Sequence, residues 1–131
     1  MIRIYIYSWL FLSLISATGT WMINGRTHAE LKWKTITTEN FDIHYHQGIY
    51  DIAIKGAAIA EQVRPTLMKQ MGLKTLKKLD IVFTSEDEIL NGFAMPSNKT
   101  IIWIDQNDAA LWSGDEKWLR SVVAHEIQHL V

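Results

Sequence analysis

Alternating hydrophobic and polar positions predict two strands shortly after residue 30. In the segment "WKTITTENFDIHYH", residues 33–37 alternate first, and Phe41, Ile43 and Tyr45 then share one side of a second strand. A period of two with β-branched and aromatic residues is typical of strands. We therefore expect a pair of strands whose second member buries its aromatic and aliphatic side.

Further strands and a long helix are predicted in the middle of the chain. Apolar runs at residues 79–84 and 100–105 predict two strands, and the Asn-Gly and Pro signals of residues 91–96 predict a loop between them. Apolar positions at helical spacing predict a helix over residues 51–72, which Pro65 kinks or splits and which the terminal glycine ends. The order of strands, helix, strands and helix indicates an α+β fold.

The last helix is predicted over residues 115–131. Ser113 is its expected N-cap, and Glu116 completes a capping box. When this helix is projected with Trp118 at 0°, its apolar side spans roughly 0° to 180°. On the same projection His125, Glu126 and His129 fall at about 340°, 80° and 20°. We therefore expect all three polar side chains to point toward the apolar side.

These three residues form a His-Glu-x-x-His motif, which predicts a metal site. Burial without partners would cost on the order of 2 kcal/mol or more for each side chain. On a helix, His125 and His129 are one turn apart and can share a Zn²⁺ ion at about 2.1 Å. Glu126 then lies beside the ion and can act as a general base on metal-bound water. The competing interpretation is a helix with two partly exposed histidines and an ion-paired glutamate.

Composition narrows the possible sites and partners. The chain has 131 residues, enough for one domain or part of one. Its net charge of −1 gives no electrostatic basis for binding nucleic acid. Because cysteine is absent, any metal site must use His, Glu or Asp. His44 and His46 share one face of their strand, but we expect both to point to solvent, which makes them weak metal candidates.

The N-terminus indicates export. Arg3 precedes residues 4–23, which carry no charge, as in a secretory signal peptide. Small residues permit cleavage after Gly19 or after Ala29, and we prefer Ala29 because it lies beyond the apolar run. The alternative is an uncleaved membrane anchor. We expect residues 1–29 to be a signal peptide or anchor, and residues 30–131 to be exported, either to the periplasm or beyond the cell.

The segments "WKTITTENFDIHYHQG", "NGFAMPSNKTIIWID" and "WLRSVVAHEIQHLV" resemble gluzincin zinc metallopeptidases, and more narrowly the peptidase MA-like domains of bacterial exported proteins. The resemblance implies a first helix and a small mixed sheet that flank the active-site helix. It implies zinc ligands at His125 and His129 and a general base at Glu126. It also implies a last strand that runs along the cleft and pairs with substrate backbone: Ile101, Ile102, Trp103 and Ile104.

The same resemblance implies parts that would follow Val131. Gluzincins take a third ligand, a glutamate, from a later helix, together with an oxyanion-stabilising Tyr or His. We therefore expect the chain to be the N-terminal part of such a domain, with impaired hydrolysis and weak zinc binding. If zinc instead binds tightly, Asp105, Asp108 or His46 becomes the suspected third ligand. The expected partner is a peptide or protein substrate, and the longer protein could carry a C-terminal TolB-like β-propeller. The alternative function is a non-catalytic exported interaction module that docks such a propeller.

The cleavage hypothesis predicts the N-terminus of the exported protein. Mass spectrometry of secreted or periplasmic material should show a chain that begins near Glu30. A chain that keeps Met1 would support the uncleaved anchor instead.

Overall fold

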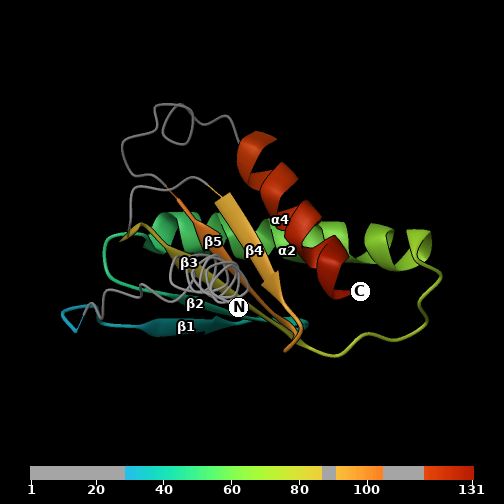
Figure 1. Cartoon of the computed structure of the whole chain (residues 1–131), viewed down its shortest axis with the longest axis horizontal. Helices are drawn as coiled ribbons and strands as arrows, with labels where there is room; N and C mark the ends of the chain where they lie inside the picture. Colours follow the sequence, from blue (N-terminus) through green and yellow to red (C-terminus); the bar gives the residue numbers. More distant parts are fainter. Residues whose placement is uncertain (1–28, 87–90, 105–116) are drawn as a thin grey trace, which may run out of the picture. The chain divides into compact units, whose positions relative to one another are not determined.

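A computed structural model describes residues 29–86, 91–104 and 117–131 of the chain. The described residues from Leu31 onward belong to one compact unit, an α+β domain in which they form a five-stranded sheet (Figure 1). Its elements, in chain order, are β1 Lys34–Thr37, β2 Phe41–Tyr45, α2 Tyr50–Gln70, β3 Leu79–Thr84, β4 Asn91–Met95, β5 Lys99–Trp103 and α4 Lys117–Leu130. The predicted fold class is therefore confirmed.

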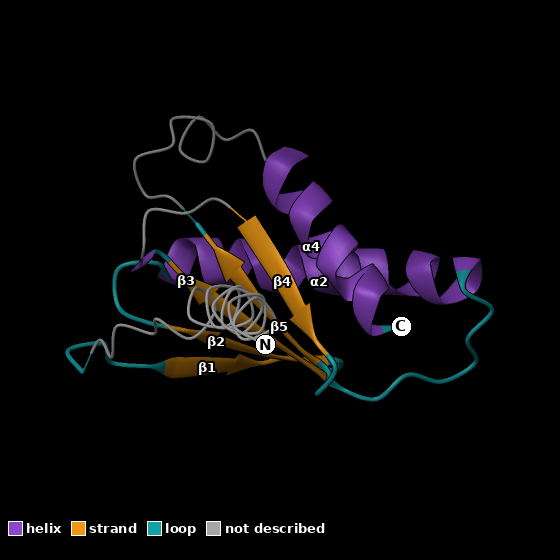
Figure 2. Ribbon diagram, in the orientation of Figure 1, coloured by secondary structure: helices purple, strands orange, loops and turns teal. Residues whose placement is uncertain are grey.

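The strands form one mixed sheet in the order β1-β2-β3-β5-β4 (Figure 2). β2, β3 and β5 run parallel to one another in the centre of the sheet. β1 pairs antiparallel with β2 at one edge, and β4 pairs antiparallel with β5 at the other. β2 and β3 are joined by α2, because parallel neighbours need a long crossover connection. β4 and β5 form a hairpin whose turn contains Asn98 at a φ of 61°.

The hydrophobic core lies between one face of the sheet and the two helices. Phe83, Ile102 and Gly92 are register partners on β3, β5 and β4, so their side-chain directions share this face. α2 approaches Phe83 at Gly56, where an added Cβ would overlap the phenylalanine ring. α4 approaches Gly92 through Glu126. Both helices therefore cover the same face of the sheet, and they also pack against each other.

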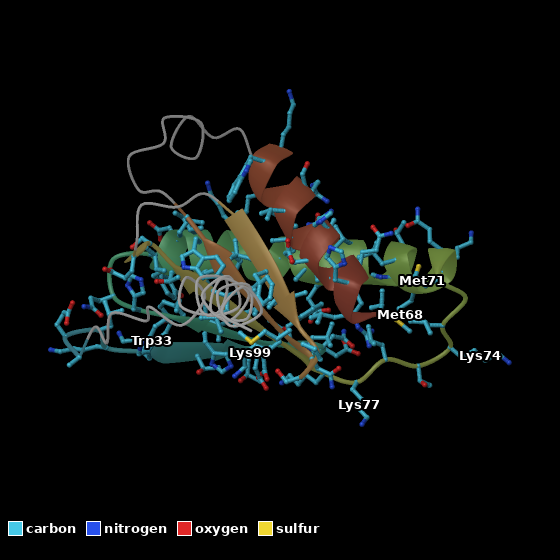
Figure 3. All side chains as sticks on the ribbon, viewed as in Figure 1. Trp33, Met68, Met71, Lys74, Lys77 and Lys99 are labelled. Atoms are coloured by element: carbon cyan, nitrogen blue, oxygen red, sulfur yellow. The ribbon has the colours of Figure 1, made fainter. Side chains whose placement is uncertain are left out.

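The long helix α2 ends as predicted. Gly72 has a φ of +69°, and its N–H donates to the Lys69 carbonyl at 3.3 Å. The N–H of Leu73 donates to the Met68 carbonyl at 2.9 Å, which completes a Schellman motif. The chain then leaves the helix through an exposed loop with several lysines (Figure 3). Pro65 lies inside one unbroken helix, so the predicted split does not occur.

The other sequence predictions have mixed outcomes. Phe41, Ile43 and Tyr45 are buried, as their alternation predicts. The loop predicted for residues 91–96 is wrong, because residues 91–95 form β4 and pair with β5. Ser113 and Glu116, the predicted capping box, lie outside the described residues, as do the N-terminal residues 1–28. Among the helices that the structure describes, none is long and apolar enough to cross a membrane.

Glu61 on α2 ties the helix to the turn between β1 and β2. Its carboxylate accepts hydrogen bonds from the Thr38 hydroxyl at 2.6 Å, from the Asn40 backbone N–H at 2.8 Å and from the Asn40 side-chain amide at 2.7 Å. Burial would raise the pKa of Glu61, but these hydrogen bonds and the positive charge of Arg64 outweigh burial and lower the pKa below the ordinary glutamate value. The ionised form therefore stabilises the fold.

Glu61→Gln should lower the free energy of unfolding by about 1–2 kcal/mol at pH 7, because charge-assisted hydrogen bonds are lost. The pKa of Glu61 is lower in the folded than in the unfolded protein, so its contribution is complete above the unfolded pKa and fades as pH falls through the folded pKa. The difference between variant and parent should therefore shrink below about pH 4 in urea titrations. Glu39→Gln, at an exposed position of the same turn, is the control. Equal losses for both variants would contradict the assigned role of Glu61.

Candidate functional site

The rotation of α4 is fixed by its buried residues. Leu119, Val123 and Ile127 recur every four residues and are each at most 3% exposed. On the helix projection, the mean direction of these three residues and Glu126 is about 125°, which is well away from Trp118 at 0°. Trp118 is only half-buried. The buried face of α4 is therefore narrower than the apolar pattern suggests, and it leaves His125 and His129 on the rim, the border between the buried and exposed faces of the helix.

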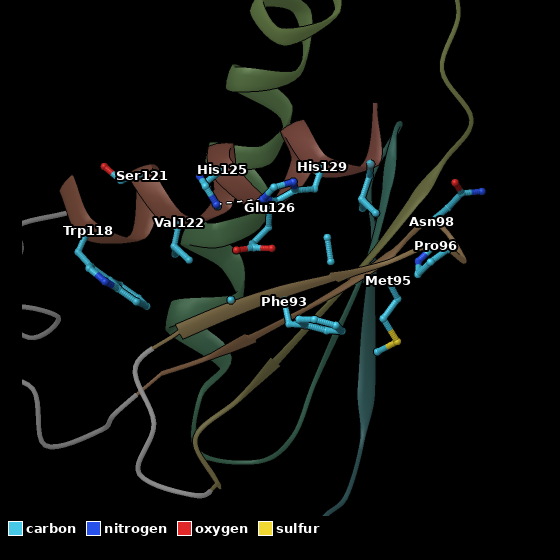
Figure 4. Close-up of a pocket in the computed structure, with 13 residues that line it drawn as sticks. Phe93, Met95, Pro96, Asn98, Trp118, Ser121, Val122, His125, Glu126 and His129 are labelled. Atoms are coloured by element: carbon cyan, nitrogen blue, oxygen red, sulfur yellow. Dashed lines mark hydrogen bonds between the residues drawn. The ribbon is translucent and has the colours of Figure 1, made fainter. Parts of the chain in front are cut away.

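His125 and His129 lie on that rim and are exposed (Figure 4). The expectation that they point into the apolar side is wrong, because they fall more than about 100° from the centre of the buried face. Their Nε2 atoms are 3.0 Å apart, and the rings meet edge to face. Two imidazole nitrogens bound tetrahedrally at about 2.1 Å from one zinc ion would lie roughly 3.4 Å apart. The two side chains could therefore bind one ion with little rearrangement.

Glu126 differs from the histidines because it is only 5% exposed. Its side chain extends from α4 toward β4, beside the two imidazoles (Figure 4). Gly92 on β4 packs directly against it. For Glu126 the predicted orientation toward the buried side is confirmed. A carboxylate in this position is shielded from bulk water and faces the same space as the histidine nitrogens.

A groove between α4 and the β4–β5 hairpin passes over these side chains. It has a volume of about 870 Å³. Its lining comes from the hairpin and from one stripe of α4: Gly92, Phe93, Ala94, Met95, Pro96, Asn98, Trp118, Ser121, Val122, His125, Glu126, His129 and Leu130. Outside the motif this lining carries no charged side chain. Outside the motif the groove is therefore lined by apolar and uncharged polar side chains, and its ionisable groups are those of the motif.

The strand that borders the groove is not the one that the resemblance implies. Residues 101–103 belong to β5, which pairs with β3 on one side and with β4 on the other. Ile104 follows β5, is fully buried, and donates its N–H to the Thr84 carbonyl at 2.8 Å. β5 therefore has no edge along which a substrate strand could add. The edge strand is β4, which the sequence pattern assigned to a loop.

The two upstream histidines have structural surroundings. His46 is 2% exposed, so its expected exposure to solvent is wrong; β2 ends at Tyr45, and strand alternation no longer applies beyond it. Its Nδ1–H donates to the Gln47 carbonyl at 2.9 Å, and its Nε2 accepts from the Ser85 N–H at 3.2 Å. His44 is half-buried between the Thr35 hydroxyl at 2.9 Å and the Asp80 carboxylate at 3.4 Å. Neither histidine lines the groove.

A third ligand does not accompany His125 and His129 in residues 29–86, 91–104 and 117–131. No group of three or more His, Cys, Asp or Glu side chains in these ranges is arranged to hold a metal ion. Asp105 and Asp108, the carboxylates suspected from the sequence, lie outside the described residues. Gly92 and β4 are the parts of the site that the sequence patterns missed, because the Asn-Gly pair at the start of β4 is a turn signal.

Comparisons with known proteins add no family to these observations. No protein-family model matches the chain, and no curated protein matches it significantly. The resemblance to gluzincins therefore rests on the residues of the motif and on their surroundings.

The histidine pair predicts a specific dependence of zinc binding on both rings. His129→Ala should weaken zinc binding by at least about tenfold, because a single imidazole cannot chelate the ion. Calorimetric titration of the full chain with Zn²⁺ measures this change. His44→Ala, which removes a histidine away from the groove, should bind zinc like the parent. Equal binding by all three proteins would show that the ion binds elsewhere.

Proposed function

We propose that the domain is a zinc-dependent peptidase module that binds an extended peptide in the groove between α4 and β4. The observation that carries this proposal is the juxtaposition of a shielded carboxylate, Glu126, with two imidazole Nε2 atoms 3.0 Å apart at the wall of a groove bounded by an edge strand. The arrangement of a first helix, a mixed sheet and a motif-bearing helix also agrees with the resemblance to gluzincins.

His125 and His129 are the residues that would hold zinc. Neutral imidazole is a preferred ligand for this ion. The 3.0 Å between the two Nε2 atoms is close to the roughly 3.4 Å expected for two ligands of a tetrahedral zinc ion, which supports the fit. Zinc, when bound, supplies a Lewis acid that polarises a carbonyl group and acidifies water. In a catalytic site three protein groups usually hold the ion, so the proposal requires one more ligand from outside the described residues.

Glu126 would move the proton in this reaction. Its carboxylate faces the same space as the two Nε2 atoms, so it can accept a proton from a water molecule that attacks a peptide carbonyl there. The protonated carboxyl group can then deliver that proton to the amine that leaves. Because Glu126 is 5% exposed, bulk water screens its charge little, which strengthens its interaction with a nearby developing charge.

β4 would bind the backbone of the substrate. It is an edge strand, and an extended peptide can add to such an edge through main-chain hydrogen bonds. α4 runs alongside β4, so a peptide on this edge passes the motif (Figure 1). Trp118 and Val122 on α4 line the same groove and offer apolar contacts to substrate side chains. Backbone pairing and hydrolysis would thus occur in one groove.

A non-catalytic interaction module is the second candidate function. The observation that favours it is the absence of a three-residue metal group among the described residues. In that case β4 and the groove would bind a peptide segment of a partner without cleaving it. Glu126 favours the enzyme, because binding alone does not require a shielded carboxylate beside two imidazoles.

Glu126→Gln should keep zinc binding and reduce peptide hydrolysis by about 10²-fold or more, because the general base is lost while both imidazoles remain. The measurement combines zinc titration with hydrolysis of a mixed peptide library by the full chain. Gln128→Ala, at an exposed position two residues along the same helix, is the matched control and should leave both readouts unchanged. Hydrolysis by Glu126→Gln at the parental rate would remove the proposed mechanism. A parent that binds peptides and zinc without hydrolysis would support the interaction module instead.

A further inference from the structure

Gly92 sits at the point where the edge strand meets the motif helix. It pairs with Ile102 of β5, which in turn lies beside Phe83 of β3 on the helix-covered face. A side chain at position 92 would therefore project from β4 toward α4. Glu126 occupies that space.

The contact between the two residues leaves no room for a Cβ atom at position 92 unless one of them shifts. A Cβ atom added to Gly92 would lie 2.5 Å from Cγ, 2.5 Å from Oε1 and 2.7 Å from Cδ of Glu126. Carbon atoms that are not bonded to each other separate at about 3.5–4.0 Å. An added methyl group would therefore have to displace the Glu126 side chain or push β4 away from α4.

Backbone conformation does not explain this glycine. Gly48 and Gly72 have positive φ angles and open space around them, whereas Gly92 lies in a regular strand without a positive φ. Glycine weakens a strand, because it contributes no side-chain packing and loses more conformational entropy on folding. Ala94, two residues along the same face, does carry a Cβ. The requirement for glycine is therefore local to the contact with Glu126.

We infer that Gly92 is a positioning residue for Glu126: the missing Cβ on β4 leaves the space in which the glutamate side chain lies beside the histidine pair. Its part in catalysis rests on the proposed peptidase function, whereas the steric coupling between the two residues does not. The positions of β4 and Glu126 are thus coupled, since the strand that would hold the substrate also sets the place of the carboxylate.

A double-mutant cycle on stability tests the coupling without any activity. Gly92→Ala should clearly lower the urea midpoint of the full chain. In the Glu126→Ala background, which removes all the atoms that clash, it should lower the midpoint by less than about a third as much. In the Glu126→Gln background, which keeps the length of the side chain, the loss should equal that in the parent. If Gly92→Ala alone does not fold, folding of the double variant with Glu126→Ala gives the same answer. Equal losses in all three backgrounds would overturn the inference.

Kinetics then separate positioning of the base from general packing. In an active parent, Gly92→Ala should reduce kcat by about 10²-fold, as for a catalytic group misplaced by about 1 Å, with KM and zinc affinity unchanged. A rise in KM with unchanged kcat would show that Gly92 serves substrate binding and would overturn the positioning role. A parent without hydrolysis, combined with the predicted stability coupling, would remove the proposed function and leave Gly92 as the residue that places Glu126.

Discussion

The rotation of α4 about its own axis decides where every motif side chain lies. Three aliphatic residues, Leu119, Val123 and Ile127, are buried between α4 and the rest of the domain, and they leave the helix one orientation in which its apolar face is covered. Glu126 is next to this face and is carried inward, while His125 and His129 are carried to the rim. Burial of these aliphatic side chains, each worth about 1.5–3 kcal/mol, therefore sets the positions of the polar motif residues.

Local periodicity explains what could be predicted from the sequence. The alternation in residues 41–45, the apolar run of residues 79–84 and the helical spacing before Gly72 each describe one element and its buried side, and all three agree with the structure. The spacing of His125 and His129 also predicts their convergence, because an interval of four residues on a helix brings two side chains together whatever surrounds them.

The remaining features depend on contacts between distant parts of the chain. β4 has the turn-forming residues of a loop, yet pairing with β5 makes it a strand, which local preference could not show. The sequence of residues 101–103 in β5 does not reveal that β4 pairs beside them and forms the edge of the sheet. His46 is buried because Ser85 and Gln47 meet it beyond the end of β2. Gly92 has a reason only once α4 and β4 are in place.

The composition of β4 has a consequence for the behaviour of the protein at high concentration. The strand sequence "NGFAM" contains no charged residue, and Phe93 is 39% exposed. Proteins commonly protect open sheet edges with lysine, inward-pointing charges or proline, because an unprotected edge pairs readily with another chain. Within the described residues no further strand covers this edge, and β4 itself holds neither lysine nor proline; Pro96 follows it directly. An edge open to an extended peptide is equally open to β4 of a second molecule. Self-association would therefore compete with a peptide ligand for the same backbone hydrogen-bonding groups of β4. A high concentration of the protein would then reduce the binding of that ligand.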